Sequence, residues 1–195
     1  MSVLAESLGV RTSARYTVAT RVALVVLGSL VVAGLAQLSV KLPFTPVPIT
    51  GQTLGVLLVG GSLGATMGGA ALLLYLVEGA IGLPFFAAGS SGLSLLKVSS
   101  VFGGYLWGFV VAALVVGWLS QRKWDRGIGS AIGSMLVGEV IIYAIAIPWF
   151  VHAAGVPATK ALELGLYPFV VGDTIKLLIA AAALPAAWRF VGNRS

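Results

Sequence analysis

The sequence contains no cysteine and very little charge. Asp, Glu, Lys and Arg together make up 9% of its 195 residues, whereas a soluble domain typically carries about 25%. The absence of cysteine excludes a disulfide framework, a cysteine-based metal site and a thiol nucleophile. So few charges cannot cover a water-facing surface, and 58% of the residues are hydrophobic. The composition therefore predicts an all-α membrane protein whose apolar side chains face lipid.

Several catalytic motifs are also missing. The sequence has no G-x-x-x-x-G-K-[ST] P-loop, no G-x-S-x-G and no H-E-x-x-H, so it does not hydrolyse ATP through a P-loop. Its single histidine, His152, falls in an expected outer loop with no nearby ligand set for a metal. We therefore expect no enzyme activity, no metal and no cofactor.

The net charge of +6 raises the question of a nucleic-acid partner. The basic residues lie at the edges of apolar runs instead, as the positive-inside rule predicts for a membrane protein, and we expect no nucleic acid to bind. The apolar run after Arg21 is too long for a cleavable signal peptide. The main basic positions are Arg11, Arg15 and Arg21, then Arg122, Lys123 and Arg126, and finally Arg189 and Arg194.

Four apolar segments reach the ~20 residues that a membrane-spanning helix needs: 22–40, 101–120, 128–150 and 166–188. Residues 51–82 are long for one span and short for two, and they contain the glycine-rich stretch 60–64, which favours a tight turn. Two crossings, over 48–60 and 64–82, place all main basic clusters on one side. We therefore predict one integral membrane domain over 1–195, with six transmembrane helices and both termini cytoplasmic.

Two unusual loops then lie on the outer side. The loop 42–50 contains three prolines and precedes a short second span, so it either dips into the protein beside a ligand or forms a stiff surface loop. The loop 83–100 is rich in glycine, serine and phenylalanine, and it either approaches a ligand closely or is an ordinary flexible loop. Because both loops lie on the same outer side, they favour a pocket that opens outward.

Charged residues within spans are candidates for function. Asp173 and Lys176 share one face of the last span, about two turns from its outer end. They either bind a polar or anionic ligand or neutralise each other in a salt bridge. Glu139, deep in the fifth span, is either a proton relay or a partner in an interhelical hydrogen bond. Glu78 either lines the pocket or reaches the interface.

Several segments closely resemble motifs of the BioY proteins, the biotin-specific substrate-binding (S) components of energy-coupling factor (ECF) transporters. The first and last of these segments are the specific ones. The matching segments are residues 43–56, residues 74–76 with 79–84, Gly103-Gly104-Tyr105-Leu106 with Gly108-Phe109, Tyr143 with Pro148-Trp149, and Pro168-Phe169 with Gly172-Asp173 and Lys176.

This resemblance implies an ECF S-component-like bundle of six helices in the bacterial cytoplasmic membrane. It implies outward-side capture of biotin, with a transmembrane coupling protein and two ABC-type ATPases as partners. Lys176 is expected to face the biotin carboxylate, while Asp173 either holds Lys176 or meets a ureido N–H. The other implied ligand-binding residues are Gln52, Ser90, Gly89, Tyr105 and Phe44.

The sequence departs from the family pattern at two places. It reads Ala87-Ala88-Gly89-Ser90-Ser91-Gly92 where the family often has A-G-G-S-G-G, and Ser100-Val101-Phe102 where G-P-T is common. These changes put the loop conformation in question. Two alternatives to the ECF function are a self-sufficient proton-coupled vitamin carrier that uses Glu139, and an S component for another small vitamin.

Overall fold

The computed structural model describes residues 4–5 and 18–192, without the side chains of residues 191 and 192. Within this part of the chain, five helices are long and apolar enough to cross a membrane, which agrees with the prediction of an all-α membrane protein. They are α2 (Val18–Gln37), α3 (Gln52–Ala80), α4 (Gly103–Gln121), α5 (Ile128–Ala154) and α7 (Val170–Gly192).

Helix α3 is a helical hairpin, because its chain reverses at Gly64. Gly64 leaves the helical conformation with φ +79° and ψ 177°, a backbone geometry that glycine adopts without a steric penalty. The side-chain amide of Gln52 lies 2.6 Å from the hydroxyl of Tyr75, although 23 residues in one straight helix would span about 35 Å. The prediction that residues 51–82 form two arms joined by a glycine turn is therefore confirmed.

Close backbone packing holds this turn against α4. A Cβ atom at Gly117 would lie 2.3 Å from the carbonyl carbon of Gly64, and one at Gly60 would lie 2.9 Å from the carbonyl oxygen of Ala113. The hydroxyl of Ser120 donates a hydrogen bond of 2.6 Å to the carbonyl of Gly61. α4 is accordingly the most buried of the five helices, and α2 is the least buried.

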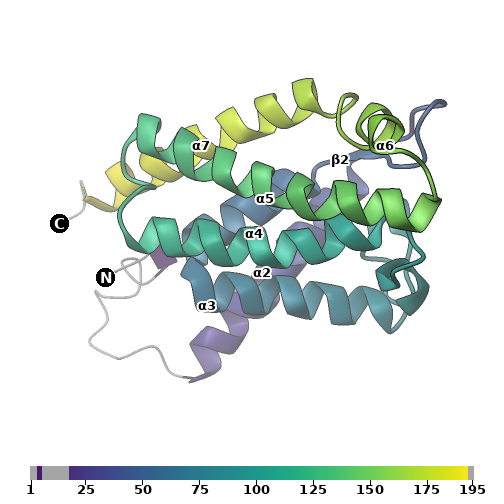
Figure 1. The fold of residues 1–195 in the computed structure, drawn as a ribbon. Helices are drawn as coiled ribbons and strands as arrows, with labels where there is room; N and C mark the ends of the chain where they lie inside the picture. Colours follow the sequence, from purple (N-terminus) through teal and green to yellow (C-terminus); the bar gives the residue numbers. More distant parts are fainter. Residues whose placement is uncertain (1–3, 6–17, 193–195) are drawn as a thin grey trace.

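The two ends of the bundle differ in what they carry (Figure 1). At one end lie the start of α2, the turn of α3, the loop 122–127 and the end of α7; we call this the hairpin end. At the other, the strand end, lie the two short strands, the loop 81–102 and helix α6 (Ala158–Gly165). Arg21, the basic residues of 122–126 and Arg189 belong to the hairpin end. Arg11, Arg15 and Arg194 lie outside the described residues.

The strand end contains regular structure that the sequence did not predict. Strand β1 (Ser39–Val40) pairs antiparallel with β2 (Ile49–Thr50), with Ser39 opposite Thr50 and Val40 opposite Ile49. The intervening prolines lack N–H groups and cannot extend this ladder. The loop 81–102 contains two short 3-10 helices, η1 (Ala87–Gly89) and η2 (Leu93–Leu96).

The helix boundaries differ from the predicted spans by a few residues. α2 ends at Gln37 and α3 begins at Gln52 because the intervening chain forms the β1–β2 pair. α7 begins at Val170, directly after the segment that contains Pro168. As a result Asp173 lies in the first turn of α7, closer to the helix start than the predicted two turns.

Candidate ligand-binding site

A cavity of about 450 Å³ lies at the strand end, within the size range of small-molecule sites. Its walls come from the loop 41–48, from strand β2, from η1, and from helices α3, α4, α5 and α7. Most of the wall is apolar, as is usual for such sites. Its aromatic lining residues are Phe86, Phe102, Tyr105, Phe109, Tyr143 and Phe169.

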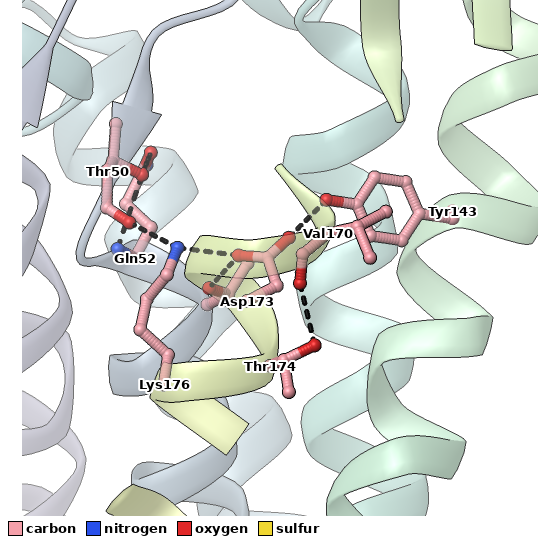
Figure 2. Close-up of polar contacts among 8 residues, drawn as sticks. Thr50, Gln52, Tyr143, Val170, Asp173, Thr174 and Lys176 are labelled. Atoms are coloured by element: carbon pink, nitrogen blue, oxygen red, sulfur yellow. Dashed lines mark hydrogen bonds and ion pairs between the residues drawn. The ribbon is translucent and has the colours of Figure 1, made fainter. Parts of the chain in front are cut away.

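Asp173 is the centre of the polar part of this cavity. Its carboxylate Oδ1 lies 2.6 Å from the Lys176 ammonium and accepts a 3.1 Å hydrogen bond from the Thr53 hydroxyl. Its Oδ2 accepts a hydrogen bond from the Tyr143 hydroxyl. These contacts join α7, α3 and α5 around one carboxylate (Figure 2). The first turn of α7 also favours a negative charge, because the helix dipole is positive there.

Lys176 lies one turn further along α7, and its ammonium sits between Asp173 and strand β2 (Figure 2). It donates a 2.7 Å hydrogen bond to the backbone carbonyl of Thr50. The Lys176 side chain is 14% exposed and that of Asp173 is 7% exposed. Removing two charges from water is costly unless they pair and their remaining groups are hydrogen-bonded. This pair meets both conditions.

A second set of hydrogen bonds connects the polar cluster to the hairpin. Thr50 donates to the side-chain carbonyl of Gln52 at 2.8 Å, and the Gln52 amide donates to the Tyr75 hydroxyl at 2.6 Å. The Tyr75 ring meets the Phe86 ring edge to face, with ring centroids 5.5 Å apart. The two arms of α3 and the cavity wall are therefore held by one continuous chain of contacts.

The loop after α3 forms the wall that contains Phe86. The Phe86 ring fits over Gly79, where an added Cβ would lie 2.3 Å from two ring carbons. The N–H of Gly92 donates to the carbonyl of Gly79 at 2.8 Å, and the Gln37 side chain of α2 donates to the carbonyl of Pro84 at 3.2 Å. These contacts fix the loop to two helices.

The neighbouring Ala88 also lines the cavity, and it adopts φ +55° and ψ 35°. This left-handed conformation favours glycine, because in other residues the Cβ lies close to the backbone. The A-G-G-S-G-G pattern that this segment resembles has glycine at this position, so the conformation agrees with that pattern although the residue does not.

The structure brings five of the seven predicted ligand-binding residues together around the cavity. The residues that line it are Gln52, Ser90, Tyr105, Asp173 and Lys176. Phe44 is 61% exposed and does not line the cavity. Gly89 is exposed and does not line the cavity. Ligand contact by each of the seven stays a prediction.

Sequence reasoning missed two partners of Asp173. Thr53 follows Gln52 in the first motif, and Tyr143 lies one helical turn after Glu139 in a largely apolar span, which was a usable signal. Their distance from Asp173 along the chain, 120 and 30 residues, gave no indication of contact. The contact of Lys176 with the backbone carbonyl of Thr50 could not be predicted either, because a backbone carbonyl leaves no mark in the residue types of the sequence.

The other titratable candidates do not line the cavity. Glu139 is 5% exposed, and neither carboxyl oxygen has a hydrogen-bond partner among the described residues, so the structure does not contain the interhelical hydrogen bond considered for it. Glu78 is half-buried in the second arm of α3. His152 is exposed in the last turn of α5 instead of in a loop.

Comparison with known proteins identifies the family of this chain. The sequence matches the BioY family over residues 7–193, which is nearly the whole chain. The chain belongs to the BioY family.

Its relatives in this family include the biotin transporter BioY of Rhizobium etli, 38% identical over 73% of this chain and 78% of the relative. The biotin transporter BioY of Thermotoga maritima is 37% identical over 73% of this chain and 81% of the relative. Both relatives are described as transporters and not as enzymes, which agrees with the expectation from the missing catalytic motifs.

A solved structure shares the fold. It is described as the S-component for biotin from an ECF-type ABC transporter, and it covers 88% of this chain and 92% of its own with a TM-score of 0.78. At 23% sequence identity this likeness concerns the fold alone. It agrees with the predicted S-component-like bundle.

Proposed function

We propose that this protein is the biotin-binding S component of an ECF-type vitamin importer. Family membership and the S-component fold support this function. The observation that carries the proposal is the cavity at the strand end, where apolar and aromatic walls surround one buried polar cluster. A ligand such as biotin, with a polar ring system and an aliphatic chain, matches that division.

The Asp173–Lys176 pair has hydrogen-bonding capacity left for such a ligand. An ammonium has three donors, and Lys176 uses two of them on Asp173 and Thr50. A carboxylate has about four acceptor sites, and Asp173 uses three on Lys176, Thr53 and Tyr143.

One donor and one acceptor are therefore left next to each other. A ureido group offers the matching N–H and carbonyl, so in our proposal the pair binds the ureido ring of biotin. In this proposal Lys176 does not bind the biotin carboxylate, the role that the resemblance implied, because Asp173 already neutralises its charge.

The direction of capture follows from the charges at the two ends. Five basic residues of the described chain belong to the hairpin end and three lysines to the strand end: Arg21, Arg122, Lys123, Arg126 and Arg189 against Lys41, Lys97 and Lys160. The positive-inside rule then places the hairpin end in the bacterial cytoplasm and the cavity outside. With the two arms of α3 counted as two crossings, the chain crosses the membrane six times.

The chain itself has no P-loop, so ATP-driven import needs other subunits. We propose a transmembrane coupling protein and two ABC-type ATPases as partners. A self-sufficient proton-coupled carrier predicts instead that a host without these subunits takes up biotin only with a proton gradient. In that case Glu139→Gln would abolish uptake.

Calorimetric titration of the purified protein with biotin and with other small vitamins tests the ligand. We expect saturable binding of biotin at one site and much weaker binding of the other vitamins. Tight binding of a different vitamin would move the protein to another S-component specificity. Failure of biotin to bind would refute the proposal.

A further inference from the structure

Two lysines line the cavity, and their surroundings differ. Lys176 comes from α7 and is mostly buried, whereas Lys41 follows strand β1 and is exposed. A ligand that carries a carboxylate needs a cation whose charge is not already neutralised. The two lysines are therefore not equivalent candidates for that role.

Lys176 already has its counter-ion. Its ammonium lies 2.6 Å from the Asp173 carboxylate, so the pair carries no net charge. A second carboxylate beside this pair would face Asp173 as well, and like charges at close range repel in a poorly solvated site. Lys176 is thus better suited to a neutral polar group.

Lys41 has no counter-ion in the part of the chain that the structure describes. The ion pairs found there join Lys160 to Glu163 and Lys176 to Asp173. Among the described residues that line the cavity, Lys41 is thus the lysine whose charge no neighbouring carboxylate neutralises.

The strand pairing relates the two lysines in space. Thr50, whose carbonyl binds Lys176, stands opposite Ser39 in the β1–β2 pair. Lys41 lies two residues beyond Ser39, which is about 7 Å along an extended chain, on the side that leads away from α3. A ligand that lies along β2 can place one end at Lys176 and the other at Lys41.

We propose that Lys41 binds the carboxylate of the ligand at the mouth of the cavity, while the Asp173–Lys176 pair binds its neutral polar ring. This inference rests on the proposed biotin-binding function and assigns the two ends of the ligand. Through Lys41, a cavity whose ion pair is self-neutralised still offers a free cation to an anionic vitamin.

The effect of Lys41 on affinity is moderate because its side chain is exposed. Exposed ion pairs contribute about 0.2–1 kcal/mol, which corresponds to a loss of up to about fivefold in affinity when the pair is removed. Salt screens such a contact, so the loss is largest in dilute buffer.

The test compares biotin with biotin amide, which lacks the negative charge, on the wild type and on Lys41→Ala. We expect Lys41→Ala to weaken biotin binding about three- to fivefold at low salt and to leave binding of the amide unchanged. Lys41→Arg should restore biotin binding. Lys176→Ala should weaken both ligands alike, by about tenfold or more, because it removes a charged hydrogen bond to the ring.

Lys97→Ala is the matched control, since Lys97 is an exposed lysine of the same end that does not line the cavity. Unchanged biotin binding in Lys41→Ala would overturn the inference, as would an equal loss for biotin and its amide. If the wild type binds biotin, either of these results overturns the inference and leaves the proposed function intact. A wild-type protein that does not bind biotin overturns both.

Discussion

The two ends of this bundle are packed in opposite ways. At the hairpin end, glycines let backbones touch, as at Gly117 against Gly64 and at Gly60 against Ala113. At the strand end the same helices separate around a cavity of about 450 Å³. There the helices are joined by hydrogen bonds and an ion pair.

This difference shows how a small membrane protein can combine closely packed helices with a cavity. Without a hydrophobic driving force between helices in lipid, small residues and polar contacts supply much of the helix association. The hairpin end relies mainly on small residues, with the hydrogen bond from Ser120 to Gly61 beside them. At the strand end the polar contacts line the cavity, where a ligand can meet them.

The largest effect of a substitution is expected at Asp173, at the strand end. Asp173→Ala leaves the Lys176 ammonium without a counter-ion and the hydroxyls of Thr53 and Tyr143 without their acceptor. Removing one partner of a buried ion pair typically costs about 3–5 kcal/mol, so we expect a large fall in thermal stability in detergent. Biotin binding should be lost as well.

Asp173→Asn is the matched control for this change. The amide keeps the shape of the side chain and one carbonyl oxygen, so we expect it to retain part of the lost stability. Equal stability of Asp173→Ala and the wild type would show that the strand end does not depend on the ion pair.

A smaller effect is expected at the hairpin end from Gly117→Ala. The new methyl would lie 2.3 Å from the backbone of Gly64, so the turn of α3 must move away from α4. Overpacking of this kind costs about 1–3 kcal/mol, measured as a lower unfolding temperature. Gly34→Ala is the control, because a Cβ there meets nothing within 4 Å; similar losses in both variants would contradict the account.

The smallest effect is expected in the cavity wall from Ala88→Gly. A left-handed conformation costs a residue with a Cβ about 1–2 kcal/mol, and Ala88→Gly removes this cost. The greater flexibility of glycine offsets about 0.5–1 kcal/mol of the resulting gain in stability. We therefore expect slower hydrogen exchange in the loop 83–92 and a slightly higher unfolding temperature. Faster exchange would show that this conformation is not strained.

Much of this fold could be predicted because its signals are local. Apolar runs identified the spans, and the glycine-rich stretch 60–64 identified the hairpin of α3. The β1–β2 pair escaped prediction because two-residue strands are too short to show a period in hydrophobicity. α6 escaped prediction because its 8 residues are far fewer than a membrane span needs. The start of α7 was placed several residues too early because apolar residues on both sides of Pro168 read as one span.

The site was predictable only in part. Asp173 and Lys176 were visible as charges within an apolar span, and their spacing predicted a common helix face. Tyr143 and Thr53 reach Asp173 only through the packing of α5 and α3 against α7, which one sequence does not encode as a local pattern. Phe44 shares the first motif with Gln52, yet its side chain turns outward because loop geometry, not sequence proximity, decides which residues face the cavity.

The central claim is that biotin occupies the cavity at the strand end. It is tested most directly by filling the cavity with Ala87→Trp and measuring the dissociation constant for biotin, with Leu93→Trp as the matched change in the same loop. Ala87 lines the cavity, whereas Leu93 is 61% exposed and does not. We predict a loss of about 100-fold or more for Ala87→Trp, equivalent to about 2.7 kcal/mol, and binding near the wild-type value for Leu93→Trp. Unchanged biotin affinity in a folded Ala87→Trp variant would place the ligand elsewhere and contradict the account.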